Sequence, residues 1–156
     1  MISSLHDCID SVKEPEQKGV LILTTRYRTT NVPTIIDLNG AEITEFNFTY
    51  DEKTEVDGSC ALVWKNENFV FGGFDRCGQI AKIEDCGLRK IGSFNFCHRY
   101  GACANVKNEK ILLCFNADPS DGDRCRSSPS PTENFEDFPR SNFGHRFTKI
   151  AALESE

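Results

Sequence analysis

Runs of apolar residues divide the chain into short segments that predict β-strands. Residues 20–25 (VLILTT) are apolar and β-branched, which is typical of a buried strand. A second strand is predicted within residues 31–40, where the dipeptide Asn39-Gly40 is a strong turn signal. In residues 41–50 apolar side chains fall at or near every second position. Because no segment keeps a helical period over three turns, the pattern predicts an all-β fold.

Two longer units follow, and each resembles the other. Residues 58–73 (GSCALVWKNENFVFGG) and residues 101–115 (GACANVKNEKILLCF) both begin with Gly, a small residue, Cys and Ala, and both contain Lys-Asn-Glu. Three landmarks recur at separations of 43 to 48 residues: Cys60 and Cys103, Phe46-Asn47-Phe48 and Phe94-Asn95-Phe96, and His98-Arg99-Tyr100 and His145-Arg146-Phe147. A repeat of this length with about four short strands per unit is typical of β-propeller blades.

This repeat predicts an irregular lead-in over residues 1–18 and a partial propeller of about three blades over residues 19–156. Closed propellers have about 4 to 8 blades, so the predicted ring is incomplete. The remaining blades would come from a longer protein, or the exposed edges would favour self-association.

The apolar strand that ends in Gly72-Gly73, together with the Asn-containing turn and apolar strand before it, looks like a kelch repeat. Residues 98–115 are similar, and Cys114-Phe115 stand where the Gly pair would recur. The resemblance covers residues 20–156 and implies a Cys-bearing, kelch-like propeller of the galactose-oxidase type. It also implies structural roles within the blades for four glycines: Gly58, Gly72, Gly73 and Gly101.

The eight cysteines are even in number, which suits disulfides. If Asn108-Glu109 forms a two-residue turn, Cys103 faces Cys114 across a hairpin, where Cβ atoms are about 5 Å apart. A competing pairing joins Cys114 to Cys125 and closes the intervening loop. In the earlier hairpin a turn at Asn66-Glu67 would place Cys60 opposite Gly73, without a partner there. Buried free thiols are the remaining alternative, so Cys103, Cys114 and Cys125 are candidates only.

Charge and cysteine content bear on partner and compartment. The net charge of −6 argues against nucleic acid or an anionic membrane as the partner. The polar first nineteen residues lack the apolar core of a secretory signal. The cysteines and one glycosylation sequon, which makes Asn47 a candidate site, favour an extracellular location. The compartment therefore stays open and leans extracellular.

Candidate chemistry is sparse. Cys97, His98 and Cys103 are residue types that bind zinc, but no Cys-x-x-Cys occurs, and the repeated His-Arg-aromatic triplet favours a structural role. The galactose-oxidase resemblance implies copper held by two His and a Cys-linked Tyr, and the three His and three Tyr here show no such arrangement. We therefore expect no enzyme activity, no catalytic residues, no metal and no cofactor.

Six phenylalanines fall at positions that favour packing between blades, with an aromatic ligand cage as the alternative: Phe46, Phe48, Phe69, Phe71, Phe94 and Phe96. The function we expect is a non-enzymatic scaffold or binding module in a larger extracellular protein, with inter-strand loops that hold a protein or glycan. The alternatives are an intracellular kelch-type adaptor and a fragment of a copper enzyme.

Overall fold

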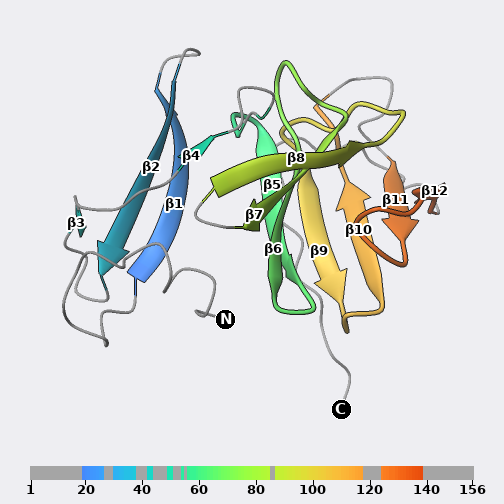
Figure 1. The fold of residues 1–156 in the computed structure, drawn as a ribbon. Helices are drawn as coiled ribbons and strands as arrows, with labels where there is room; N and C mark the ends of the chain where they lie inside the picture. Colours follow the sequence, from blue (N-terminus) through green and yellow to red (C-terminus); the bar gives the residue numbers. More distant parts are fainter. Residues whose placement is uncertain are drawn as a thin grey trace.

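The structure, a computed structural model, describes residues 19–26, 30–37, 42–43, 49–50, 54, 56–84, 87–117 and 124–138. Within these ranges every regular element is a β-strand, so the predicted all-β class is confirmed (Figure 1). The strands are β1 (Gly19–Arg26), β2 (Thr30–Asp37), β3 (Glu42–Ile43), β4 (Thr49–Tyr50), β5 (Ser59–Trp64), β6 (Glu67–Gly72), β7 (Gln79–Glu84), β8 (Gly87–Ser93), β9 (Ala102–Val106), β10 (Lys110–Cys114), β11 (Cys125–Ser128) and β12 (Glu136–Asp137). The predicted lead-in over residues 1–18 lies outside the described residues.

The strands form three sheets. β1, β2 and β3 pair antiparallel in chain order. The two units of the sequence repeat each form a meander of four antiparallel strands, β5 to β8 and β9 to β12. The first meander gains a fifth strand, because β4 pairs in parallel with β8. This parallel strand is a correction to the predicted four-stranded unit, and its short pairing, from Thr49 to Tyr50, gives it little sequence signal.

The backbone of the two meanders repeats closely. Residues with positive φ recur in the same order: Gly58 (65°) and Tyr100 (52°), Lys65 (46°) and Lys107 (53°), Asn66 (68°) and Asn108 (55°), Gly72 (71°) and Phe115 (61°). The first three pairs are 42 residues apart and the last pair is 43 apart. The difference arises at the second hairpin turn, which has one residue more than the first.

The predicted hairpin registers are wrong in both meanders. In the first, the turn is Lys65-Asn66, and Cys60 lies opposite Phe71 rather than Gly73. A two-residue hairpin turn of this kind requires positive φ at both central positions, and the chain adopts it one residue earlier than we predicted. The register of a hairpin follows from the position and length of its turn.

In the second meander Val106 pairs with Lys110, so the turn spans three residues instead of the predicted two. Cys103 therefore lies opposite Leu113, and Cys114 lies opposite Ala102. Because a shift of one residue moves a side chain to the other face of the sheet, Cys103 and Cys114 point to opposite faces. The predicted hairpin pairing of these two cysteines is consequently wrong.

The main core lies between the two meanders. Its buried members come from both sheets: Trp64, Phe69, Phe71 and Ile80 from the first, and Ile111 and Leu113 from the second. Half-buried Phe94, Phe96 and Phe135 pack against this cluster. Four of the six phenylalanines predicted to pack between blades thus lie in the core between the sheets, while Phe46 and Phe48 lie outside the described residues.

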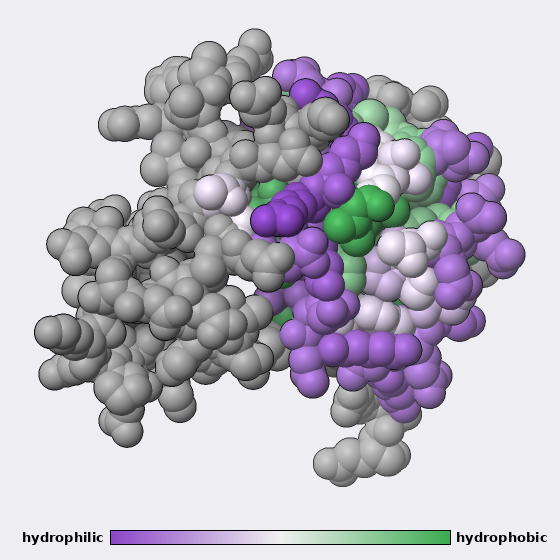
Figure 2. All heavy atoms as spheres, in the orientation of Figure 1, coloured by the Kyte–Doolittle hydropathy of each residue, from purple (hydrophilic) through white to green (hydrophobic). Residues whose placement is uncertain are grey.

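A second, smaller cluster lies on the other face of the first meander. Val70, between Phe69 and Phe71 on β6, packs with Ala81 and Leu88. Alternate residues of one strand thus enter two different cores, as expected for a sheet covered on both faces. Figure 2 shows that the described surface on the viewed face is mainly hydrophilic, with hydrophobic side chains visible between the hydrophilic ones. In the described ranges no helix is long and apolar enough to cross a membrane.

Replacement of Phe71 by Ala should destabilise the fold strongly. The Phe71 side chain is 0% exposed at the centre of the core, so the change leaves a cavity and should lower the free energy of unfolding by about 3 to 5 kcal/mol. The matched control, Ile91→Ala on β8, removes a side chain that is 37% exposed and should cost less than about 1 kcal/mol. Urea unfolding followed by circular dichroism measures both, and equal losses would contradict the position of the core.

Candidate functional site at the junction of the two sheets

A connector, residues 94–101, leads from β8 to β9 and crosses the ends of the first meander's strands. Backbone hydrogen bonds fix its path: Phe94 N donates to Gly78 O (2.8 Å), His98 N to Cys77 O (2.8 Å), Gly73 N to His98 O (3.1 Å) and Tyr100 N to Gly58 O (2.7 Å). The connector is thereby bonded in turn beside β7, β6 and β5. This segment contains the His-Arg-aromatic triplet that we expected to be structural.

Three of the four glycines predicted to have structural roles lie against this connector, and the fourth, Gly101, is its last residue. A Cβ at Gly72 would overlap the carbonyl oxygen of His98, and a Cβ at Gly101 would overlap the His98 ring and lie 2.6 Å from Cys114 O. A Cβ at Gly58 would lie 3.1 Å from the ring of Tyr100, and Gly73 donates its N–H to His98 O. Glycine at these positions lets the connector approach the sheets closely.

The second meander holds the connector from its other side. Asn116, which follows β10, donates from Nδ2 to Cys97 O and accepts at Oδ1 from Arg99 N (3.2 Å). Ala117 N also donates to Arg99 O (2.9 Å). Asn116 is 3% exposed, so its amide replaces water as the partner of these backbone groups. Sequence reasoning missed Asn116, because a single Asn after a strand is indistinguishable from an ordinary turn residue.

Three disulfides reinforce the same region. Cys60–Cys103 joins β5 to β9, Cys77–Cys97 joins the connector to the residue pair before β7, and Cys114–Cys125 joins paired positions of β10 and β11. Cys114 thus pairs with Cys125, one of the two partners left open by the sequence, whereas Cys103 pairs with Cys60, which the sequence did not suggest. The free-thiol alternative does not hold for these six cysteines. Several disulfides in one small domain are typical of an oxidising compartment.

The Cys60–Cys103 disulfide spans the longest loop of the three. Its cysteines are 43 residues apart, against 20 for Cys77–Cys97 and 11 for Cys114–Cys125. Loop-closure entropy then assigns it a stabilisation of about 4 kcal/mol, compared with about 3 kcal/mol for the shortest loop. It is also the disulfide of the three that links the two meanders to each other.

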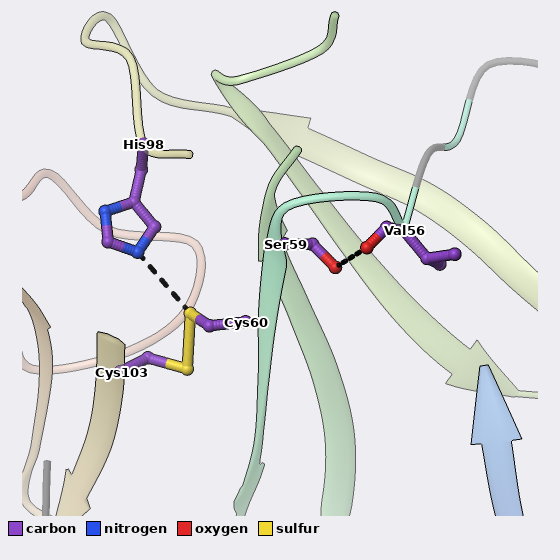
Figure 3. The surroundings of a disulfide bond; sticks show 5 residues. All are labelled: Val56, Ser59, Cys60, His98 and Cys103. Carbon is purple, nitrogen blue, oxygen red and sulfur yellow. Dashed lines mark hydrogen bonds between the residues drawn. A yellow bond between two sulfur atoms is a disulfide. The ribbon is translucent and has the colours of Figure 1, made fainter. Parts of the chain in front are cut away.

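Figure 3 shows His98 with its ring directed at this disulfide. His98 Nε2 lies 3.5 Å from Cys60 Sγ, and the residue is 2% exposed. Ser59 Oγ donates to Val56 O (2.7 Å) and holds the start of β5 beside the disulfide. Of the arrangements in this region, the contact of a buried imidazole with a sulfur atom is the one best suited to chemical reaction, because the ring can stabilise a thiolate.

At the opposite end of β5 and β9 the two hairpin turns are linked by asparagines. Asn105 Nδ2 donates to Val63 O (2.6 Å), and Asn108 Oδ1 accepts from Lys65 N (3.3 Å). Asn105 and Asn108 also bond to each other. We call the exposed residues 65–67 and 107–110 the paired-turn surface. It carries ammonium, amide and carboxylate groups on two rigid turns.

An ion-pair group adjoins this surface. Lys82 Nζ lies 2.8 Å from Glu67 Oε1 and 3.3 Å from Glu84 Oε2. The hydrogen bond to Glu67, with help from Glu84, holds the pKa of Lys82 above its ordinary value. The group ties β6 to β7 near the turn. Because the Glu67 side chain is exposed and that of Glu84 is partly exposed, the contribution of the group to stability is modest.

An open polar groove of about 560 Å³ lies on the second meander and meets the paired-turn surface at Lys110. Its lining consists of Lys110, Ser127, Ser128, Pro129, Thr132, Glu133, Asn134 and Glu136. In the described part of the chain no group of three or more His, Cys, Asp or Glu is placed to hold a metal ion. Cys97 and Cys103, weighed above as zinc ligands, are both in disulfides, and Asn47 lies outside the described residues.

No protein-family model matches this sequence, and no curated protein matches it. The class of the protein is therefore defined by its structure alone. It is an all-β protein with two repeated four-stranded antiparallel meanders and disulfide cross-links.

Replacement of Gly72 by Ala should disturb the junction. The new Cβ would overlap backbone of the connector at a position whose φ is 71°, so we expect a loss of about 2 kcal/mol or more in the free energy of unfolding. The matched control is Gly92→Ala on β8, where a Cβ would make ordinary contact at 3.6 Å with Ile80 and stability should change little. Thermal denaturation of both variants checks this, and a neutral Gly72→Ala would show that the connector does not approach so closely.

Proposed function

We propose that this chain is a segment of a kelch-like β-propeller that serves as a non-enzymatic binding or scaffold module in an extracellular protein. The observation that carries the proposal is the stacking of two four-stranded meanders whose equivalent residues are 42 to 43 residues apart. Propeller blades are four-stranded antiparallel sheets that repeat in this way around a central axis. Further blades of the same protein, or a second copy of the chain, would complete the ring.

The use of polar groups at the junction supports a structural rather than a catalytic role for this region. Asn116 bonds to the backbone of Cys97 and Arg99, six cysteines pair with one another, and these bonds fix the two sheets. A scaffold held in this way can present its loops rigidly, and loops on rigid scaffolds are frequent binding sites. The three disulfides support the extracellular assignment, since such bonds persist outside the reducing cytosol.

The paired-turn surface and the adjoining groove are where we place the partner. Both offer hydrogen-bonding groups at fixed positions, among them Lys65, Lys107 and Lys110, with Asn134 and Glu136 in the groove. The Asn105 and Asn108 bonds hold the two turns together, so binding would cost little ordering entropy. Hydroxyl, amide and charged groups of this kind suit a glycan or a polar protein segment.

The test is a binding screen with charge-reversal variants of the oxidised protein, secreted from a eukaryotic host. Immobilised wild-type chain is exposed to a glycan array and to a panel of secreted protein domains. We expect at least one ligand, and we expect Lys65→Glu/Lys107→Glu to weaken its binding about tenfold or more through loss of two contacts. The matched control Lys90→Glu, exposed on β8, should bind as the wild type does. Retention of no ligand, or equal binding by both variants, would contradict the proposed site.

A further inference from the structure

We infer that Cys60–Cys103 is a thiol–disulfide exchange site, opened selectively by a small-molecule thiol, with His98 as the positioning residue that stabilises Cys60 as the leaving thiolate. This inference does not depend on the propeller or on any partner. It starts from the contact between His98 Nε2 and Cys60 Sγ, 3.5 Å apart, which is drawn in Figure 3.

The position of His98 is fixed by its surroundings. Its N–H donates to Cys77 O (2.8 Å), and its carbonyl accepts from Gly73 N (3.1 Å). Gly72 and Gly101 pack so closely that neither leaves room for a Cβ. The imidazole is therefore held in one position against the sulfur. His98 is only 2% exposed, and this burial strengthens any charge interaction of the ring with a thiolate.

Contact with histidine distinguishes this disulfide from the other two, and access distinguishes it from Cys114–Cys125. His98 is the only histidine among the residues that the structure describes, and its ring contacts the sulfur of Cys60. Cys60 and Cys103 are both half-buried, so a small thiol can approach them, whereas Cys114 is only 3% exposed. A nearby imidazolium lowers the pKa of a cysteine thiol, and a thiol of lower pKa leaves faster in exchange.

The exchange balances with a monothiol as reductant. Its thiolate attacks Cys103 Sγ, a new sulfur–sulfur bond forms there, and the bonding electron pair leaves with Cys60 Sγ as a thiolate beside His98. A second thiolate attacks the reductant sulfur of this mixed disulfide and releases the Cys103 thiolate. Overall, one protein disulfide and two monothiols give two protein thiols and one small disulfide, and the protons of the monothiols end on the protein.

The consequence would be specific to the interface between the meanders. Cys60–Cys103 is the disulfide that ties β5 to β9, while Cys77–Cys97 and Cys114–Cys125 lie within one meander and its connector or hairpin. Its opening removes the covalent tie between the sheets and leaves both meanders cross-linked. The apolar core and the hydrogen bonds of Asn105 to Val63 and of Lys65 to Asn108 would remain across the interface.

The first test needs only the wild-type full chain. The oxidised protein is exposed to graded ratios of reduced to oxidised glutathione, quenched by alkylation and mapped by mass spectrometry. We expect Cys60 and Cys103 to be alkylated about tenfold faster than Cys114 and Cys125. In the fully reduced protein at neutral pH, Cys60 should also react faster than Cys103. Prior or simultaneous opening of either other disulfide would overturn the inference.

The second test replaces His98 by Gln, which retains size and polarity but forms no cation. We expect opening of Cys60–Cys103 to slow about tenfold, and a tenfold shift in its exchange equilibrium corresponds to about 30 mV in reduction potential. Cys114–Cys125 in the same molecule is the internal control and should be unchanged. Ser59→Ala, beside the disulfide but bonded to Val56, should behave as wild type. Equal rates in wild type and His98→Gln would assign His98 a purely structural role and overturn the inference.

Discussion

The core between the two meanders forms because opposite faces of the two equivalent sheets pack against each other. Phe69 and Phe71 of β6 point toward the second meander and pack in one cluster with Ile111 and Leu113 of β10. On the 43-residue spacing of β6 and β10, Leu113 corresponds to Val70, which points away from this core. The two sheets therefore meet through opposite faces of the repeat. The inter-sheet disulfide closes across the same interface, and the connector and its glycines lie at one end of it.

The same offset explains why two cysteines at similar places in the repeat can bond to each other. By backbone geometry Cys60 corresponds to Ala102, not to Cys103, because the hairpin strands are related by 42 residues. Cys103 is therefore on the opposite face of its sheet from the position equivalent to Cys60. Two residues on opposite faces of stacked, equivalent sheets point at each other, and the disulfide closes across the interface.

Much of the fold could be predicted from sequence, because apolar patterning and repeat length reflect local structure. The first two strands of each meander lie within the two similar segments, residues 58–73 and 101–115, and Phe69 and Phe71 lie in the core as expected. The hairpin registers could not be predicted, since Lys-Asn-Glu does not reveal how many of its residues form the turn: two in the first hairpin and three in the second. That one-residue uncertainty decides which faces the cysteines occupy.

The junction itself depends on contacts between residues far apart in the chain. Nothing in the local sequence of Asn116 indicates that its amide bonds to Cys97 and Arg99, nor does the sequence near Cys60 place His98 beside it. The sequence indicated structural roles for the glycines, but it did not indicate that the connector is the backbone that packs against them. Residue type and spacing thus indicated structural positions without identifying the partner of each.

The most direct measurement is the disulfide connectivity of the protein expressed in an oxidising host, obtained by proteolysis without reduction and mass spectrometry of the linked peptides. Stacking of the two repeats through opposite faces predicts a peptide pair joined by Cys60 and Cys103, together with pairs joined by Cys77–Cys97 and Cys114–Cys125. A peptide pair joining Cys103 to Cys114, or freely alkylated Cys60 and Cys103 in the oxidised protein, would contradict the account.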